Sequence, residues 1–281
     1  MVAKNKTEKE KEEIMHDSKI EWVLNPDNKT LGKIWNPITG CLNGCPYCYA
    51  RKLANTRLKQ RYLANNNLPL HALPYSSYMA DPFYPRFWPE RLYIPFNSKP
   101  KGIFTVDMGE LFGDWIPREW QDDIFRVIKL HPNDRFYLLT KQPQNLAKFS
   151  PFPDNCWVGV SVCNDKMLDV AVDKLEDIQA THKYFSFEPL KERLSLSLDY
   201  ALNYSGVSWL IIGAQTKPTV YPKLEWVEEI VKAADKAGIP VFIKNNLSPY
   251  ASNLQLYPNM WVGDNDWDRL RQEMPEVKRN G

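Results

Sequence analysis

Cys41, Cys45 and Cys48 lie within a stretch of eight residues, in the spacing C-x3-C-x2-C. Cysteine thiolates hold iron–sulfur clusters, usually four thiolates to a cluster. Three thiolates this close together predict a [4Fe-4S] cluster in which three irons have a protein ligand and the fourth has none. A metal position without a protein ligand is open to a cofactor or substrate, so the spacing predicts a site of chemistry.

Two other uses of these cysteines stay open. A structural zinc ion normally has four ligands, and the only further cysteines, Cys156 and Cys163, lie far along the chain. The four histidines form no ligand-like pair: His16, His71, His131 and His182. A disulfide framework suits a small secreted chain, whereas this chain has 281 residues and an odd number of cysteines. A zinc ion with a distant ligand, or no metal at all, are therefore the alternatives to a cluster.

The composition is that of an ordinary globular protein, with 43% hydrophobic and 25% charged residues. No apolar run reaches the roughly 18 residues that a membrane span requires, and the charged start of the chain lacks the apolar core of a signal peptide. We therefore expect a protein of the cytoplasm, where cysteines stay reduced and can bind metal. A net charge of +2 gives no general field that would attract nucleic acid.

Short β-rich runs alternate with amphipathic helical patterns along most of the chain. Strands are expected at residues 31–38, 102–107, 135–139, 156–162, 183–187, 207–212 and 239–243. Helices are expected at residues 117–130, 165–180 and 224–237, and another is expected to begin near Tyr49. This alternation predicts βαβ units and a parallel sheet. The fold class is thus α/β, and we expect a single domain built as a partial or complete (β/α) barrel of the TIM type.

Three regions make up the expected domain organisation. Residues 1–19 are mixed in charge and are expected to be disordered or frayed. Residues 20–246 form the barrel, interrupted by a segment rich in Pro, Tyr and Asn at 63–101, which is either a surface excursion or a lid. Residues 247–281 are expected to pack on the barrel as an extension. The cysteines lie between a strand and a helix, the kind of junction at which barrel enzymes place their catalytic groups.

The cysteine spacing, with Tyr47 just before the last cysteine, resembles the radical S-adenosylmethionine superfamily. Several segments resemble more closely an uncharacterised phage- and prophage-associated branch of it: WNPITGC at 35–41, DMGELF at 107–112, LLTKQP at 138–143, WVGVSV at 157–162, FEPL at 187–190 and LIIG at 210–213. The resemblance runs in one order from about residue 20 to residue 246. That branch usually has a longer gap between its first two cysteines, so this chain keeps the spacing of the wider superfamily.

The resemblance implies an enzyme with two cofactors, a [4Fe-4S] cluster and S-adenosylmethionine. The reduced cluster would cleave S-adenosylmethionine to methionine and a 5′-deoxyadenosyl radical, which abstracts hydrogen from a substrate. The protein would position these groups and exclude water. It would also need an electron donor such as a flavodoxin or ferredoxin. The substrate is unknown, and a nucleic-acid base or nucleotide is the leading hypothesis.

The resemblance also implies which residues contact the cofactors. The metal ligands are Cys41, Cys45 and Cys48. The residues expected to contact S-adenosylmethionine are Tyr47, Met108, Gly109, Glu110, Ser161, Glu188 and Gly213. Met108 stands where the superfamily has a glycine, so Gly109 and Glu110 carry this motif. A carboxylate such as that of Glu110 suits the methionine ammonium, and hydroxyl or carboxylate groups suit ribose.

Other polar residues have weaker assignments. Lys141 and Lys244 follow strands and are candidates to bind an anionic group of the cofactor or substrate. Cys163 is a candidate hydrogen donor or radical relay, whereas Cys156 is expected to be a buried apolar side chain. The basic residues after the cysteines are a nucleic-acid signal or a solvated helix face: Arg51, Lys52, Arg57, Lys59 and Arg61. A non-enzymatic iron–sulfur or zinc binding module in a phage or defence context is the competing function. A methyltransferase that uses the same cofactor without radicals is a third possibility, but no Gly-rich nucleotide loop supports it.

Overall fold

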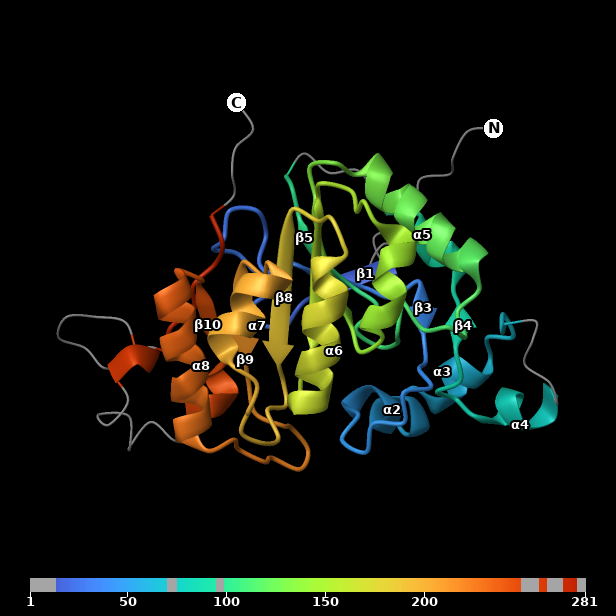
Figure 1. Cartoon of the computed structure of the whole chain (residues 1–281). Coiled ribbons are helices and arrows are strands. Elements are labelled where there is room, and N and C mark those ends of the chain that lie inside the picture. The colour runs from blue at the N-terminus through green and yellow to red at the C-terminus, as the bar shows by residue number, and fades with distance from the viewer. Residues whose placement is uncertain (1–13, 70–74, 95–98, 249–257, 262–269, 277–281) are drawn as a thin grey trace. The chain divides into compact units, whose positions relative to one another are not determined.

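The computed structural model describes residues 14–69, 75–94, 99–248, 258–261 and 270–276 (Figure 1). The chain divides into two compact units. Unit 1 is Met1–Thr140 with Pro153–Cys156, and unit 2 is Lys141–Phe152 with Trp157–Gly281. Each unit combines strands with helices, and each is described separately below.

The main sheet of unit 1 has the strand order β1-β2-β5-β6. These strands are β1 (Met15–Asp17), β2 (Lys33–Trp35), β5 (Gly102–Thr105) and β6 (Arg135–Thr140). Strands β2, β5 and β6 run parallel, whereas β1 pairs antiparallel with β2. A small second sheet pairs β3 (Ile38–Thr39) with β4 (Arg86–Phe87) in antiparallel fashion. The parallel strands place the ends of β2 and β5 at the same edge.

The helices of unit 1 are α2 (Tyr49–Asn55), α3 (Lys59–Leu63), α4 (Tyr75–Ala80) and α5 (Arg118–Leu130), with a short 3-10 helix, η1, at Pro89–Leu92. The amphipathic face of α5 buries Ile124, Val127 and Ile128, as the periodicity predicts. Helix α5 begins at Arg118, one residue later than predicted, and Pro117 is its N-cap rather than part of its first turn. Helices α2 and α3 follow the cysteines directly, so their packing decides where the cysteine loop lies.

The sheet of unit 2 has the order β7-β8-β9-β10, and the β7–β8, β8–β9 and β9–β10 pairs are all parallel. These strands are β7 (Cys156–Ser161), β8 (His182–Phe187), β9 (Trp209–Ile212) and β10 (Val241–Ile243). The helices are α6 (Asp165–Glu176), α7 (Leu198–Ser205) and α8 (Leu224–Ala237), with 3-10 helices η2 (Pro143–Phe149) and η4 (Pro258–Met260). Helix α8 has the predicted bounds, and Gly238 ends it in the left-handed conformation.

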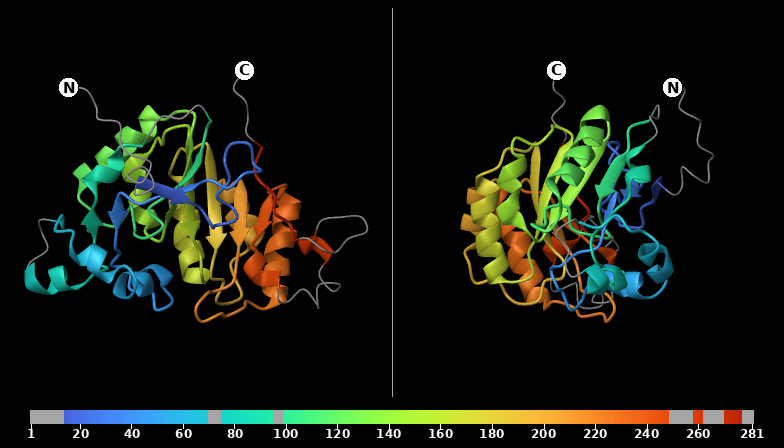
Figure 2. Two further views of the ribbon diagram at one scale, coloured as in Figure 1. Left: turned by 180° about the vertical axis from the view of Figure 1, so that it is seen from behind. Right: turned by 90° about the vertical axis from the view of Figure 1, so that its right-hand side faces the viewer.

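The two faces of the unit 2 sheet are covered differently. Helices α6, α7 and α8 lie on one face in Figure 1, and the view from behind in Figure 2 shows the strands in front of them. Lys183, on the helix side, donates from Nζ to the Leu175 carbonyl of α6. The other face carries packed aromatic rings, with Trp209 in contact with Trp157, Tyr184 and Phe242. Since side chains alternate along a strand, Ser161 and Ser186 lie on this second face.

The predicted α/β class with mostly parallel strands is confirmed. Most predicted strands are present with shorter bounds, and the helix expected at 165–180 ends at Glu176. Helix α7 was not predicted, because its sequence has a weak apolar stripe. Strand β5 ends at Thr105 rather than at Asp107, since Val106 adopts a positive φ of 64° that no strand accommodates. Closure of the strands into a barrel stays a prediction.

The segment at 63–101 contributes to the core of unit 1 in its described part. Phe83, Phe87 and Trp88 are buried there, and the Arg86 guanidinium donates to the carbonyls of Asn65, Asp81 and Tyr84. These contacts do not fit a surface excursion, whereas the role of a lid stays a prediction. Residues 70–74 and 95–98 lie outside the described residues.

Residues near each end of the chain pair with a strand of the sheet. Residues 1–13 of the segment expected to be frayed lie outside the described residues, but Met15–Asp17 form β1. In unit 2, the backbone at 271–273 bonds to β10 through Ile243 N to Arg271 O and Glu273 N to Val241 O, as an extension packing on the sheet would. In the described part of the chain, no helix is both long and apolar enough to cross a membrane.

Candidate functional site

The cysteine loop of unit 1 is held at both ends. The backbone N–H of Cys41 donates to the Phe83 carbonyl, and Arg51 Nη2 donates to the Cys41 carbonyl at 3.1 Å. The thiol sulfurs also accept backbone N–H groups, Cys41 from Asn43 and Cys48 from Arg51, each at 3.3 Å. Cys48 is thereby the N-cap of α2. The loop is a short, tethered turn whose three cysteines are all half-buried and free of disulfides.

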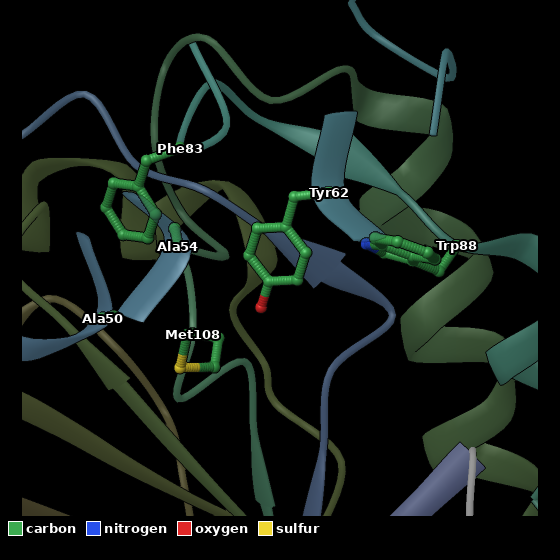
Figure 3. Packing of buried hydrophobic residues seen from close by; sticks show 6 residues of the cluster. All are labelled: Ala50, Ala54, Tyr62, Phe83, Trp88 and Met108. Carbon is green, nitrogen blue, oxygen red and sulfur yellow. The ribbon is translucent and has the colours of Figure 1, made fainter. Parts of the chain in front are cut away.

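A hydrophobic cluster anchors the two helices that follow the loop. Its buried members are Ala50, Ala54, Tyr62, Phe83, Trp88 and Met108, and Cys41 and Cys48 pack against it (Figure 3). Figure 3 shows the Tyr62 ring between Phe83 and Trp88, with Met108 nearby. The Met108 side chain is therefore a core side chain, and its backbone N–H and carbonyl bond to Asn36 and Gly40. This explains why a methionine can replace glycine at this position.

The segment after β5 lies against the cysteine loop. The Gly40 N–H donates to the Met108 carbonyl at 2.9 Å, and Gly40 and Gly109 form a parallel bridge. A Cβ on Gly109 would lie 3.0 Å from the Gly40 carbonyl oxygen, so the close approach favours glycine. Val106 begins this segment at φ 64°, a strained conformation for a β-branched residue. Strain of this kind often occurs at functional sites.

Asp107 connects Asn36, which follows β2, to Tyr49, the first residue of α2. Its carboxylate accepts from Asn36 Nδ2 at 2.6 Å and from the Tyr49 hydroxyl at 3.3 Å, while the Tyr49 hydroxyl also reaches the Asp107 carbonyl at 3.0 Å. Asn36 Oδ1 in turn accepts the Met108 N–H. Burial raises the pKa of Asp107, and the hydrogen bond from Asn36 opposes that rise. These contacts fix the segment at 107–110 relative to α2.

Glu110 is buried, and its carboxylate accepts hydrogen bonds from Thr140, Phe112 and Asn43. Oε1 accepts from the Thr140 hydroxyl at 2.6 Å and from the Phe112 N–H at 3.1 Å. Oε2 accepts from Asn43 Nδ2 at 3.1 Å. Only 3% of Glu110 is exposed, so this carboxylate has a fixed orientation with one oxygen directed at the cysteine loop. The structure thus brings together Gly109, Glu110 and the cysteine loop.

The thiol of Cys41 lies in an environment that disfavours a free thiolate. Burial raises its pKa to about 12, the Glu110 carboxylate adds to the rise, and the Asn43 N–H opposes it. The neighbouring Cys48 and Cys45 also raise it. A free thiolate here would be costly, and a bound cation would lower that cost by offsetting the negative charge. The sulfurs of Cys41 and Cys48 each accept a backbone N–H, a hydrogen bond that also favours a thiolate.

Among the described residues, no group of three or more His, Cys, Asp or Glu side chains is arranged so that it could hold a metal ion.

In unit 2, Ser161 and Ser186 lie side by side at the ends of β7 and β8, where the strand register pairs them. Both are buried, and Ser186 Oγ has no hydrogen-bond partner among the described residues. Ser186 was not predicted, although its place two residues before Glu188 on a predicted strand could have suggested it. Cys163 follows β7 and is 1% exposed, with its carbonyl accepting the Lys191 N–H.

Glu188 and Lys244 form an ion pair at the ends of β8 and β10, with both side chains mostly buried. A Cβ on Gly213 would lie 2.9 Å from Lys244 Cδ and 3.2 Å from Glu188 Cδ. Gly213 therefore leaves room for this ion pair. The sequence predicted Glu188 and Lys244 as two independent candidates. They form an ion pair because β8 and β10 run parallel and end at the same edge of the sheet.

The remaining predicted residues have fewer described contacts. Tyr47 is half-buried within the cysteine loop, and Lys141 is half-buried in unit 2 just after β6. Cys156 is buried as expected, and burial raises its pKa. Sequence reasoning missed three residues of the unit 1 site, Asn36, Asn43 and Thr140. Asn36 and Thr140 lie inside the motifs at 35–41 and 138–143, so their place in these motifs could have marked them as site residues.

One comparison with known protein families gives a match, to the model described as protein of unknown function (DUF5131), over residues 17–262. No significant match was found among curated proteins or among solved structures.

Proposed function

Since the chain belongs to the DUF5131 family, whose function is unknown, we propose its function from the site: the protein is a radical S-adenosylmethionine enzyme. In this proposal Cys41, Cys45 and Cys48 ligate one [4Fe-4S] cluster. S-adenosylmethionine binds beside it. The resemblance of the ordered sequence motifs to that superfamily is the background of the proposal.

One observation carries the proposal, the contact between the cysteine loop and the segment after β5. Gly40 bonds to Met108, and Asn43 of the loop donates to Glu110 at 3.1 Å. A buried carboxylate is thus fixed against the cysteine loop, close enough to Cys41 to raise the pKa of its thiol. A ligand with an ammonium group can bind to such a carboxylate by a charge-assisted hydrogen bond. The arrangement suits a ligand that touches both the carboxylate and the metal centre.

The residues of unit 1 have defined tasks in this proposal. Glu110 Oε2 accepts the methionine ammonium, while Thr140 and Phe112 keep Oε1 in place. Gly109 lets the backbone approach closely, because it has no Cβ. When bound, the reduced cluster supplies the electron that cleaves S-adenosylmethionine to methionine and a 5′-deoxyadenosyl radical, which takes a hydrogen atom from the substrate.

The residues of unit 2 have proposed binding roles. Ser161 contacts the ribose of S-adenosylmethionine, with Glu188 and Gly213 as further contacts and Tyr47 of the loop beside the cofactor. Lys244 neutralises Glu188 and so lowers the free-energy cost of burying this carboxylate. Glu188 can then accept a hydrogen bond from a ribose hydroxyl. Lys141 and Cys163 are candidates to act on the substrate. We also propose that the parallel strands belong to a partial or complete (β/α) barrel in a cytoplasmic enzyme.

The competing function is a non-enzymatic iron–sulfur or zinc module, and anaerobic reconstitution with iron and sulfide separates the two. The enzyme is expected to bind close to four irons per chain and to give a paramagnetic signal on reduction that changes when S-adenosylmethionine is added. It should then release 5′-deoxyadenosine. A colourless protein with one tightly bound zinc ion, or a cluster indifferent to S-adenosylmethionine, would sink the proposal.

Cys48→Ser is the sharpest variant for the cluster. Serine is a better N-cap than cysteine, so α2 keeps its cap and the protein without metal should unfold at the same denaturant concentration as the wild type or slightly higher. Serine oxygen is a poor iron ligand in place of a thiolate, so iron content is expected to fall steeply. Cys156→Ala, at a buried cysteine far from the loop in sequence, is the control and should keep its iron. Equal iron in Cys48→Ser and the wild type would mean that Cys48 only caps the helix.

A further inference from the structure

The stretch of sequence that contains the cysteine loop has no acidic residues of its own. Between Asp27 and Asp81 the sequence has no Asp or Glu, whereas it has seven Lys and Arg residues. The chain as a whole has 34 acidic and 36 basic residues and a net charge of only +2. The charge is therefore segregated, and the segment that holds the proposed metal ligands is its basic part.

Four of these basic side chains are exposed on α2, α3 and the turn between them: Lys52, Arg57, Lys59 and Arg61. None of the four forms an ion pair with a described residue, and Arg61 lies over the Trp88 ring at 5.9 Å. Other residues of these two helices, Ala50, Ala54 and Tyr62, are buried in the cluster of Figure 3. The basic residues are thus exposed side chains on helices that pack against the core of unit 1.

The cysteine loop, which precedes these charges in the sequence, also exposes apolar residues. Leu42 and Tyr49 are each 40% exposed, and Pro46 is exposed between them in the sequence. The Tyr49 ring is held in place because its hydroxyl bonds to Asp107. A Cβ on Gly44 would meet nothing within 4 Å, so the outer side of the loop is open. An apolar centre with charged residues beside it is the usual construction of a transient protein interface.

We infer that this surface, made of Leu42, Pro46, Tyr49, Lys52, Arg57, Lys59 and Arg61, is the docking site of an acidic one-electron donor protein of the flavodoxin or ferredoxin class. The inference rests on the proposed function, since an electron donor is needed only if the cysteines hold a cluster. One electron would pass from the reduced donor to the oxidised cluster, so that the donor is oxidised and the cluster reduced by one electron each.

Position favours a redox protein over nucleic acid as the partner. The exposed loop residues alternate with the cysteines in the sequence, so a protein seated on them would contact the loop that carries the proposed metal ligands. The exposed apolar residues of the loop also suit a folded protein better than a phosphate backbone, which is held largely by charge. Electrostatic steering then raises the association rate, which suits a brief electron-transfer contact.

The test compares two double charge reversals, each of which changes the net charge by the same amount. Lys52→Glu with Lys59→Glu alters the surface, and Lys19→Glu with Lys129→Glu alters exposed lysines elsewhere in unit 1. Binding of an acidic flavodoxin to the full chain is measured at low and high salt. In low salt the surface variant should bind about tenfold more weakly than the wild type, and the difference should vanish in high salt. The control variant should bind like the wild type.

A second measurement uses the reconstituted protein. The rate of 5′-deoxyadenosine release with reduced flavodoxin is divided by the rate with dithionite, and the surface variant should lower this ratio about tenfold. An unchanged ratio and unchanged binding overturn the docking site alone. Binding of a single-stranded oligonucleotide that the surface variant loses, with flavodoxin unaffected, also overturns it and assigns the surface to nucleic acid. Failure to assemble a cluster, or absence of 5′-deoxyadenosine release with either reductant, overturns the proposed function and the docking site together.

Discussion

At the scale of single residues, the buried carboxylate of Glu110 is the most constrained group of the unit 1 site. It receives a backbone N–H, a hydroxyl and a side-chain amide, and it lies close enough to Cys41 to raise the pKa of that thiol. A buried charge is retained only when hydrogen bonds or a counter-charge compensate it. These donors supply part of that compensation, and a bound ammonium would add to it.

Glu110→Gln is expected to separate the structural role of this residue from cofactor binding. The NH2 group of glutamine cannot accept a hydrogen bond. At least one group that now donates to the Glu110 carboxylate therefore loses its acceptor. The free energy of unfolding should fall by about 1–3 kcal/mol. The iron content should be kept, because the thiols are intact. The affinity for S-adenosylmethionine, followed by its effect on the paramagnetic signal, should fall at least about tenfold.

Glu119→Gln provides the matched control, since Glu119 is exposed in the first turn of α5. It should leave stability within about 0.5 kcal/mol of the wild type. If Glu110→Gln bound S-adenosylmethionine as tightly as Glu119→Gln, Glu110 would be a structural residue only.

At the scale of elements, the junction between the cysteine loop and the segment after β5 depends on backbone contacts. Gly40 adopts φ +91°, and a Cβ there would lie 2.5 Å from the Tyr84 carbonyl oxygen. Its N–H bonds to Met108 on the other side. Gly40 is therefore packed between two backbone segments, which explains why a glycine stands directly before the first cysteine.

Gly40→Ala and Gly44→Ala form a matched pair at this junction. Both glycines have positive φ, but a Cβ on Gly44 meets nothing within 4 Å. Gly44→Ala should cost only the left-handed conformation, about 1 kcal/mol of unfolding free energy. Gly40→Ala adds a backbone clash and should cost at least about 3 kcal/mol. Denaturant unfolding of the metal-free protein measures both, and equal costs would show that the junction can open without penalty.

At the scale of the whole molecule, buried ionisable groups make stability depend on pH. His131 is buried beside Asp134, whose carboxylate accepts the Lys101 N–H at 2.7 Å. Burial lowers the pKa of His131, although Asp134 opposes this. The unfolded chain then binds a proton more readily than the folded one. Stability should therefore be complete above the ordinary histidine pKa near 6.5 and fall as the pH drops below it.

The measurement is the free energy of unfolding of the metal-free protein between pH 5 and pH 7. One such histidine contributes a slope of at most about 1.4 kcal/mol per pH unit. His131→Gln, which cannot titrate, should have a smaller slope over this range than the wild type. A slope unchanged by the substitution would mean that other groups dominate the pH dependence.

Local sequence patterns predicted the elements well where the pattern is strong. Helix α8 has its predicted bounds because apolar residues recur at helical spacing and Gly238 ends it. Strands β6 to β10 were predicted from apolar runs. Strand β5 was predicted too long, since the positive φ of Val106 is imposed by contacts with β2 and Gly109 that no local pattern encodes. Helix α7 was missed because its apolar stripe is weak.

The sequence by itself determined the cysteine spacing, the parallel α/β class and the absence of Asp and Glu between residues 27 and 81. Only the tertiary structure decided that Asn43 and Thr140 hold Glu110, that Met108 is a core residue, and that Lys244 pairs with Glu188. The physical reason is that spacing along a chain is a local property. Which side chains meet at the ends of parallel strands depends on strand order and register, and these are set by packing over the whole unit.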